Sequence, residues 1–183
     1  MTGAVTYLWM AILLGWVGFV TLNLMTDAQM AALMGLAFGA SCVVMLRDTI
    51  ALRGLVAVLE PVGVILPILV LRHLASKFGV EIAPLSSIEL LAFLALYIAF
   101  LLTAFDVIPF EAYRFGYAPV PVAVMVLLAC AYGAVTGNLL VPLVAVVGQL
   151  LWVLGWGSSN WFDHVTHVLL VPIVCVTLVG RLF

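Results

Sequence analysis

The stretch that decides the fold runs from residue 115 to residue 162 and reads FGYAPVPVAVMVLLACAYGAVTGNLLVPLVAVVGQLLWVLGWGSSNWF. It contains no Asp, Glu, Lys or Arg. Because a helix of about 20 apolar residues crosses the hydrocarbon core of a bilayer, this stretch is too long for one crossing. The Thr-Gly-Asn sequence at residues 136–138 favours a turn near its middle. We therefore predict two membrane helices here, over about residues 119–135 and 139–156.

The composition of the whole chain indicates the same class of protein. Of its 183 residues, 67% are apolar and only 8% are charged, whereas soluble domains carry about 25% charged residues. So few charges exclude a soluble monomer, and the lack of a basic stripe excludes nucleic acid as a partner. We predict a single transmembrane domain over residues 1–183, embedded in the lipid bilayer as a multi-pass protein of the cell membrane.

The remaining apolar runs predict five further crossings, over about residues 4–25, 29–46, 54–72, 88–108 and 161–181. The predicted fold class is therefore all-α, a polytopic membrane helix bundle with about seven transmembrane helices. Six helices are the alternative, with part of residues 119–156 re-entrant. Basic residues are divided evenly between the two faces of the seven-helix arrangement, so the positive-inside rule assigns no orientation.

The sequence GLAFG at residues 35–39 places two glycines four apart in an apolar helix. Small residues at this spacing let the backbones of two membrane helices approach closely. We expect this face to pack against another helix of the same chain, and a homo-oligomer interface is the alternative.

Glu60 lies inside the predicted span 54–72, with Pro61 directly after it and Pro67 further along. A carboxylate at the centre of a membrane helix costs about 2.5–3.5 kcal/mol on insertion scales, which makes a function the default interpretation. Proline removes a backbone donor, and interrupted helices beside a carboxylate often form ion or substrate sites in transporters. We predict that Glu60 binds an ion or a substrate. A protonated Glu60 hydrogen-bonded to a neighbouring helix is the alternative.

A second group of charges follows the predicted span 88–108. Asp106 lies just inside its end, and Glu111 and Arg114 come shortly after it. We predict that all three contribute to a substrate or ion site. Glu111 and Arg114 are three residues apart and can pair on one helical turn, so a solvated ion pair is the simpler interpretation of those two.

The third group is a pair of histidines at the start of the predicted span 161–181. His164 and His167 are three residues apart and project from one face of a helix. This spacing suits two ligands of one divalent metal ion, with Asp106 as a further ligand, or two steps of a proton path. The alternative is structural, because Asn160 and Asp163 have the spacing of a capping box at the start of a helix.

These three groups fall at similar depth if the chain crosses seven times. Buried ionisable groups pair with each other or lose their charge, so a shared polar layer is the expected arrangement. We expect this layer near one membrane face to contain Glu60, Asp106, Glu111, Arg114, His164 and His167.

Three functions fit this pattern. The favoured one is a small transporter, permease or channel for a small solute or ion, with Glu60, Asp106, Glu111, Arg114 and His167 as binding residues. The second is a membrane-embedded metal-dependent enzyme that acts on a lipid-like substrate through His164 and His167. The third is a haem- or quinone-binding subunit of a larger membrane complex. Haem is the less favoured cofactor, because His73 falls on the opposite face from the histidine pair in the seven-helix arrangement.

Overall fold

The structure is a computed structural model that describes residues 2–59 and 63–183. It is all-helical, with 74% of the chain in helices and no strand among the described residues. The chain divides into two compact units, Met1–Ile82 and Ala83–Phe183, which we call unit 1 and unit 2. The predicted all-α class is therefore confirmed.

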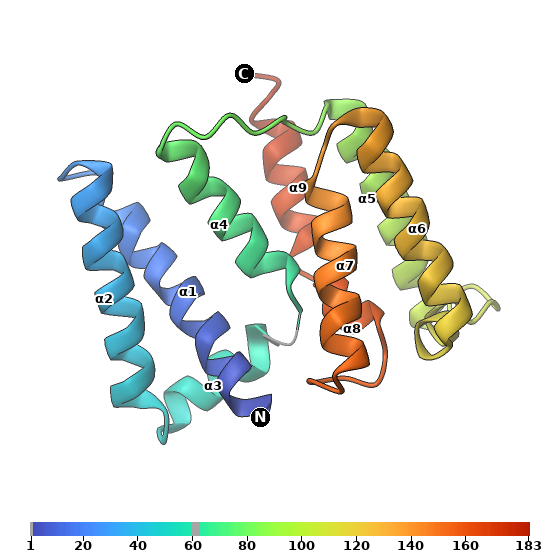
Figure 1. Cartoon of the computed structure of the whole chain (residues 1–183), viewed down its shortest axis with the longest axis horizontal. Coiled ribbons are helices and arrows are strands. Elements are labelled where there is room, and N and C mark those ends of the chain that lie inside the picture. The colour runs from blue at the N-terminus through green and yellow to red at the C-terminus, as the bar shows by residue number, and fades with distance from the viewer. Residues whose placement is uncertain (1, 60–62) are drawn as a thin grey trace. The chain divides into compact units, whose positions relative to one another are not determined.

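In unit 1, two long helices form an antiparallel hairpin, a short helix runs across one end of it, and a further helix packs against α1 (Figure 1). Asp27 begins the second helix by accepting hydrogen bonds from the backbone N–H groups of Gln29 and Met30. The described helices of this unit are α1 (Thr2–Leu22), α2 (Ala28–Leu46), α3 (Ile50–Leu59) and α4 (Ile65–Lys77).

Glycines form the contact between α1 and α2. A Cβ atom added at Gly39 would lie 2.2 Å from the carbonyl oxygen of Ala11 and 2.5 Å from the backbone nitrogen of Gly15. A Cβ atom at Gly35 would lie 2.6 Å from the carbonyl oxygen of Gly15. The predicted close packing of residues 35–39 against another helix of the chain is confirmed, and the two backbones touch directly.

In unit 2, α6 and α7 form a helical hairpin whose turn begins at Gly137, a residue with a left-handed φ of 74°. The helix α5 packs against α9 and against the 3₁₀ helix η1. The elements of this unit are α5 (Ser87–Ala104), η1 (Ala112–Tyr117), α6 (Pro119–Thr136), α7 (Leu140–Val153), α8 (Phe162–Val165) and α9 (Leu170–Val179).

Polar contacts hold the beginning of α5. Ser86 and Glu89 form a capping box, and the Tyr132 hydroxyl of α6 donates a hydrogen bond to Glu89 as well. The Arg181 guanidinium, just beyond α9, donates to the Leu85 carbonyl oxygen at 2.7 Å and to the hydroxyl of Ser87 at 3.1 Å. Side chains from α6 and from the residue just beyond α9 therefore both bind the beginning of α5.

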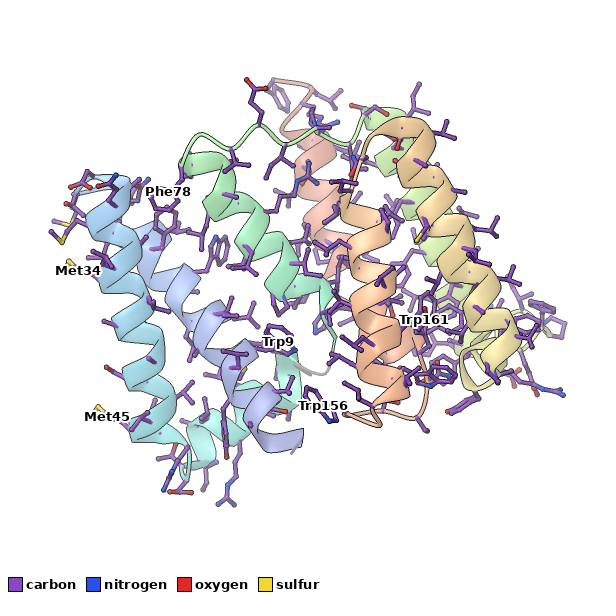
Figure 2. All side chains as sticks on the ribbon, viewed as in Figure 1. Trp9, Met34, Met45, Phe78, Trp156 and Trp161 are labelled. Carbon is purple, nitrogen blue, oxygen red and sulfur yellow. The ribbon has the colours of Figure 1, made fainter. Side chains whose placement is uncertain are left out.

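Five apolar segments have the length and composition to cross a membrane, which fits a membrane protein. Large apolar side chains cover their outer surfaces, and Met34 and Met45 point away from α2 (Figure 2). The five segments are Gly3–Leu22, Ala28–Leu46, Ser87–Ala104, Pro119–Thr136 and Phe162–Val179.

The predicted number of seven continuous membrane helices is not confirmed. The predicted span 54–72 is divided between α3 and α4, and the predicted span 139–156 contains the 14-residue helix α7. A helix of that length is about 21 Å long, which is shorter than the hydrocarbon core. The predicted span 161–181 is interrupted between α8 and α9.

Proline marks where three of these helices begin. Pro67, Pro142 and Pro172 each occupy the third position of a helix, in α4, α7 and α9 respectively. Proline lacks the N–H that a helix interior needs, and its ring clashes with the carbonyl group four residues earlier, but it is tolerated in the first turn. These prolines therefore mark the beginnings of new helices inside apolar runs.

Candidate polar site at the interrupted helix

The candidate site lies where the apolar segment Phe162–Val179 loses its helical structure. Residues 166–169 separate α8 from α9, and Thr166 has extended backbone angles, with φ −118° and ψ 162°. The carbonyl group four residues before Pro172 belongs to Val168, which lies in this interruption. The predicted crossing over residues 161–181 is therefore supported as the apolar segment Phe162–Val179, but its helix is divided into α8 and α9.

The interruption changes the backbone hydrogen bonds. The N–H of Leu169 donates to the Nδ1 atom of His167 at 3.1 Å, instead of to a carbonyl group one turn earlier. Within the described part of the chain, no backbone N–H donates to the carbonyl oxygens of His164 or Val165. Since hydrocarbon offers no donors, carbonyl groups like these are normally tolerated only against other protein groups or a water-filled cavity.

Asp163 accepts two hydrogen bonds from hydroxyl groups just before the interruption. The Tyr113 hydroxyl of η1 donates to Oδ1 at 2.6 Å, and the Ser158 hydroxyl of the α7–α8 loop donates to Oδ2 at 2.5 Å. Burial and the hydrogen bond to Asp163 raise the pKa of Tyr113. The phenol therefore keeps its proton and remains a donor to the carboxylate.

Asn160 joins the same loop to η1. Its fully buried side chain donates through Nδ2 to the Tyr113 carbonyl oxygen at 2.8 Å and accepts from the Phe162 N–H at 2.9 Å. A Cβ atom at Gly116 would lie 1.9 Å from the Asn160 Oδ1 atom, so any larger residue there displaces the Asn160 side chain. The predicted capping box is wrong, because Trp161 precedes α8 and Asp163 turns to Tyr113 and Ser158 instead.

His164 is completely buried, and one of its ring nitrogens has no partner. Its Nε2 atom lies 3.0 Å from the Ser158 carbonyl oxygen. Because a carbonyl oxygen only accepts, Nε2 carries a hydrogen, and in the neutral imidazole Nδ1 then presents a lone pair. Nδ1 is a buried atom without a hydrogen-bond partner in the described structure. Gly148 of α7 leaves the space for α8, since a Cβ atom there would lie 2.3 Å from Val165 Cγ1 and 3.5 Å from His164 Cβ.

His167 is also buried, with 7% of its surface exposed, but it is used differently. Its Nδ1 atom accepts a hydrogen bond from the Leu169 N–H inside the interruption, whereas the Nε2 atom of His164 donates to the Ser158 carbonyl oxygen in the preceding loop. Among the residues that the structure describes, no three His, Cys, Asp or Glu side chains are grouped so that they could hold a metal ion. The metal site predicted from His164, His167 and Asp106 therefore gains no support from the geometry.

Asp106 has a structural position at the end of α5. It adopts a left-handed φ of 59°, its N–H donates to the Thr103 carbonyl oxygen, and the N–H of Val107 donates to that of Leu102. These two bonds form a Schellman motif, in which Asp or Asn can replace the usual glycine. The backbone of Asp106 therefore ends α5, and its side chain is exposed. None of the described contacts joins this side chain to His164 or His167.

The other predicted site residues lie apart from the interruption or outside the description. Arg114 Nη1 and Glu111 Oε2 are 3.9 Å apart, and both side chains are about 80% exposed, so this ion pair is solvated and contributes little stability. Glu60 lies outside the described residues. Whether Glu60 belongs to the predicted polar layer therefore stays a prediction.

Sequence reasoning missed Tyr113 and Ser158 as partners of Asp163. Tyr113 and Asp163 are 50 residues apart, and no local pattern indicates their contact. The interruption could have been predicted from Pro172, because a proline ring clashes with the carbonyl group four residues earlier in a helix.

Comparison with known proteins gives no indication of the function. No protein-family model, curated protein or solved structure matches the chain. The apolar helices fit a membrane protein, and the interrupted segment of unit 2 is the most polar buried site among the described residues.

Proposed function

We propose that the chain is a small multi-pass permease or channel of the cell membrane, and that its substrate is a cation or a small solute that donates hydrogen bonds. The observation that carries this proposal is the loss of helical structure at residues 166–169, inside an apolar segment long enough to cross a membrane. Transporters often bind ions and substrates where a membrane helix is interrupted.

The chemistry of the surrounding groups supports a cationic or donor substrate. The carbonyl oxygens of His164 and Val165, the Asp163 carboxylate and the lone pair on His164 Nδ1 are all acceptors. Acceptors buried in an apolar segment are stabilised by an ion or by a donor group that enters the site. His164 and Asp163 are therefore the residues whose side chains we assign to binding, and His167 positions the interrupted backbone.

The other functions predicted from the sequence stay predictions. A metal-dependent enzyme, a haem- or quinone-binding subunit, and a homo-oligomer or larger membrane complex are each compatible with an apolar helical chain. No contact among the described residues favours one of them over a permease.

The first test is flux through the purified full chain in proteoliposomes. Uptake of protons, of monovalent and divalent cations and of small amines is measured for the wild type, Asp163→Asn and His164→Asn. We expect flux of at least one probe above protein-free vesicles, and a loss of about tenfold or more in both variants, the effect of one charge-assisted hydrogen bond.

Glu81→Gln is the matched control, because it also removes one carboxylate, from an exposed position between α4 and α5. It should keep wild-type flux. Circular dichroism and size-exclusion chromatography establish that each variant is folded. The proposal is overturned if the wild type moves none of the probes, or if folded Asp163→Asn and His164→Asn match the control.

A second variant tests the interruption itself without changing a polar side chain. Pro172→Ala restores a backbone N–H and removes the ring that opposes a continuous helix. Hydrogen exchange at residues 166–169 should slow, and flux should fall. Pro84→Ala, in the loop before α5, is the control. Undiminished flux through a chain whose helix has become continuous contradicts the proposed site.

A further inference from the structure

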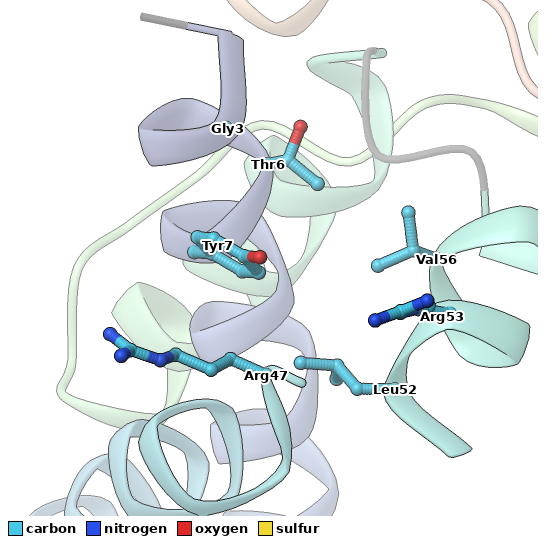
Figure 3. A pocket seen from close by; sticks show the side chains of 7 residues that line it. All are labelled: Gly3, Thr6, Tyr7, Arg47, Leu52, Arg53 and Val56. Atoms are coloured by element: carbon cyan, nitrogen blue, oxygen red, sulfur yellow. The ribbon is translucent and has the colours of Figure 1, made fainter. Parts of the chain in front are cut away.

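A cavity of about 270 Å³ opens at one end of unit 1, and it shares no residue with the site proposed above (Figure 3). Tyr7 of α1 forms one side, and Arg53 and Val56 of α3 form the opposite side. Arg47, the residue that follows α2, and the buried Leu52 complete the lining. In Figure 3 the Arg47 side chain runs past Tyr7, on the side away from Arg53. The volume is close to the lower limit of small-ligand sites, which are about 300 Å³ or larger.

The cavity carries more positive than negative charge. Arg47 Nε binds the Asp48 carboxylate at 3.2 Å, which leaves its other guanidinium nitrogens for further acceptors. Arg53 Nη2 lies 3.5 Å from the backbone carbonyl oxygen of Asp48, and no described carboxylate forms an ion pair with it. The two guanidinium groups of the lining therefore have one carboxylate beside them, that of Asp48, which binds Arg47 and is 84% exposed.

The side chains are arranged for an anion that enters from solvent. Figure 3 shows the Tyr7 hydroxyl and the Arg53 guanidinium pointing into the space between α1 and α3. A guanidinium offers several N–H groups in a planar fork that matches the oxygens of a phosphate group. The phenol hydroxyl adds a third donor, while Leu52 and Val56 provide an apolar wall.

The position in the fold indicates where the anion comes from. The cavity lies where α1 begins and α2 ends, and both helices are candidate membrane spans. It is therefore expected at the level of the lipid headgroups, where basic pockets bind anionic lipids and tyrosine is common. The short helix α3 crosses this end of the hairpin, with Leu52 buried and Arg53 exposed, as in a helix that lies along an interface (Figure 1).

We propose that this cavity binds a phosphate group, with the Arg53 guanidinium and the Tyr7 hydroxyl as the donors that point into it. The exposed Arg47 side chain lines the same cavity and joins them by rotating toward the bound anion. The phosphate belongs to an anionic lipid headgroup or to a soluble phosphate. Both sources present the same oxygens to the same donors. A lipid would in addition cover the apolar wall of Leu52 and Val56, whereas a soluble phosphate would not.

The experiment uses the purified full chain in a neutral detergent. Binding of inorganic phosphate, and of phosphatidylglycerol in mixed micelles, is measured by calorimetric titration, with diacylglycerol as the uncharged lipid. We expect phosphatidylglycerol or phosphate to bind, and Arg53→Gln to weaken binding by about tenfold or more, the effect of one charge-assisted hydrogen bond. Tyr7→Phe should weaken it by a smaller factor.

Lys77→Gln is the matched control, because it also removes one exposed positive charge from unit 1, at the end of α4. It should leave binding unchanged. If Arg53→Gln does not fold, Arg47→Gln replaces it with the same expected direction. Binding of phosphatidylglycerol alone identifies a lipid site, and competition by inorganic phosphate extends the site to soluble phosphates.

The proposal is overturned if neither probe binds more tightly than diacylglycerol. It is also overturned if Lys77→Gln weakens binding as much as Arg53→Gln, because the effect would then be one of net charge alone. Since the variants that test the permease site, Asp163→Asn, His164→Asn and Pro172→Ala, all lie in unit 2, failure of this site and failure of the proposed permease function are distinguishable.

Discussion

In unit 1, α1 and α2 are held by direct backbone contact through glycines, whereas in unit 2 the α7–α8 connection is held by hydrogen bonds between side chains. Gly39 lies against the backbone of Ala11 and Gly15. Asp163 instead joins side chains from two different segments. Apolar helices gain little from hydrophobic burial when lipid is the alternative, so close packing and hydrogen bonds replace it. The two contacts therefore respond to different changes. The glycine contact is disrupted by any added side-chain atom, and the Asp163 contact is weakened by the loss of any one donor or acceptor.

The largest effect is expected at the backbone contact. Gly39→Ala places a Cβ atom 2.2 Å from the Ala11 carbonyl oxygen, and only separation of the two helices relieves this clash. We expect a loss of about 3 kcal/mol in the free energy of unfolding, the upper end for overpacking. Unfolding in detergent micelles, followed by circular dichroism, measures it. Gly54→Ala is the control, because a Cβ atom there meets nothing within 4 Å. Equal stability of the two variants would contradict direct backbone contact.

A smaller effect is expected when the same change is made in unit 2. Gly116→Ala meets the Asn160 side chain, which can rotate away at the cost of its hydrogen bonds to Tyr113 and Phe162. We expect a loss of about 2 kcal/mol. The double variant Gly116→Ala with Asn160→Ala removes the clash with Asn160 and leaves only the contact with Phe162 Cδ2 at 2.7 Å, so its cost should be less than the sum of the two single losses. Additive losses in this cycle would show that the clash lies elsewhere.

The smallest effect is expected for one hydroxyl, and it depends on pH. Tyr113→Phe removes one donor to Asp163, and we expect a loss of about 1 kcal/mol near neutral pH. Because the pKa of Tyr113 is raised in the folded chain, its contribution is complete below the unfolded pKa of about 10 and is lost as pH rises beyond that. The stability difference between wild type and Tyr113→Phe should therefore shrink in alkaline solution. A difference that stays constant with pH would show that the Tyr113–Asp163 hydrogen bond is not the source of the effect. The loss of stability in Gly39→Ala should not depend on pH in this way.

Much of the fold was predictable from hydropathy. The boundaries of α1, α2, α5 and α6 agree with the predicted spans to within a few residues, because charges or turn residues flank each apolar run. The spans 54–72 and 161–181 are each predicted as one crossing although a proline lies inside them. The structure instead begins a new helix two residues before Pro67 and before Pro172, whereas the start of α7 before Pro142 agrees with the predicted span 139–156.

The candidate site was predictable only in part. The segment from Asp163 to His167 was identified because ionisable residues are rare in apolar runs. Asp106 belongs to the end of a helix, a role set by a left-handed backbone angle that spacing alone does not reveal. The Tyr113–Asp163 hydrogen bond joins residues 50 positions apart and depends on how the helices pack.

The hydrogen bonds from Arg181 to Leu85 and Ser87 have a consequence for biosynthesis. They join residues 96 and 94 positions apart, which is nearly the whole of unit 2. The start of α5 therefore stays without this partner until Arg181 has left the ribosome, whereas the α1–α2 hairpin is complete once residue 46 has emerged. During synthesis, the turn before α5 is consequently without two of the hydrogen bonds that hold it in the folded chain.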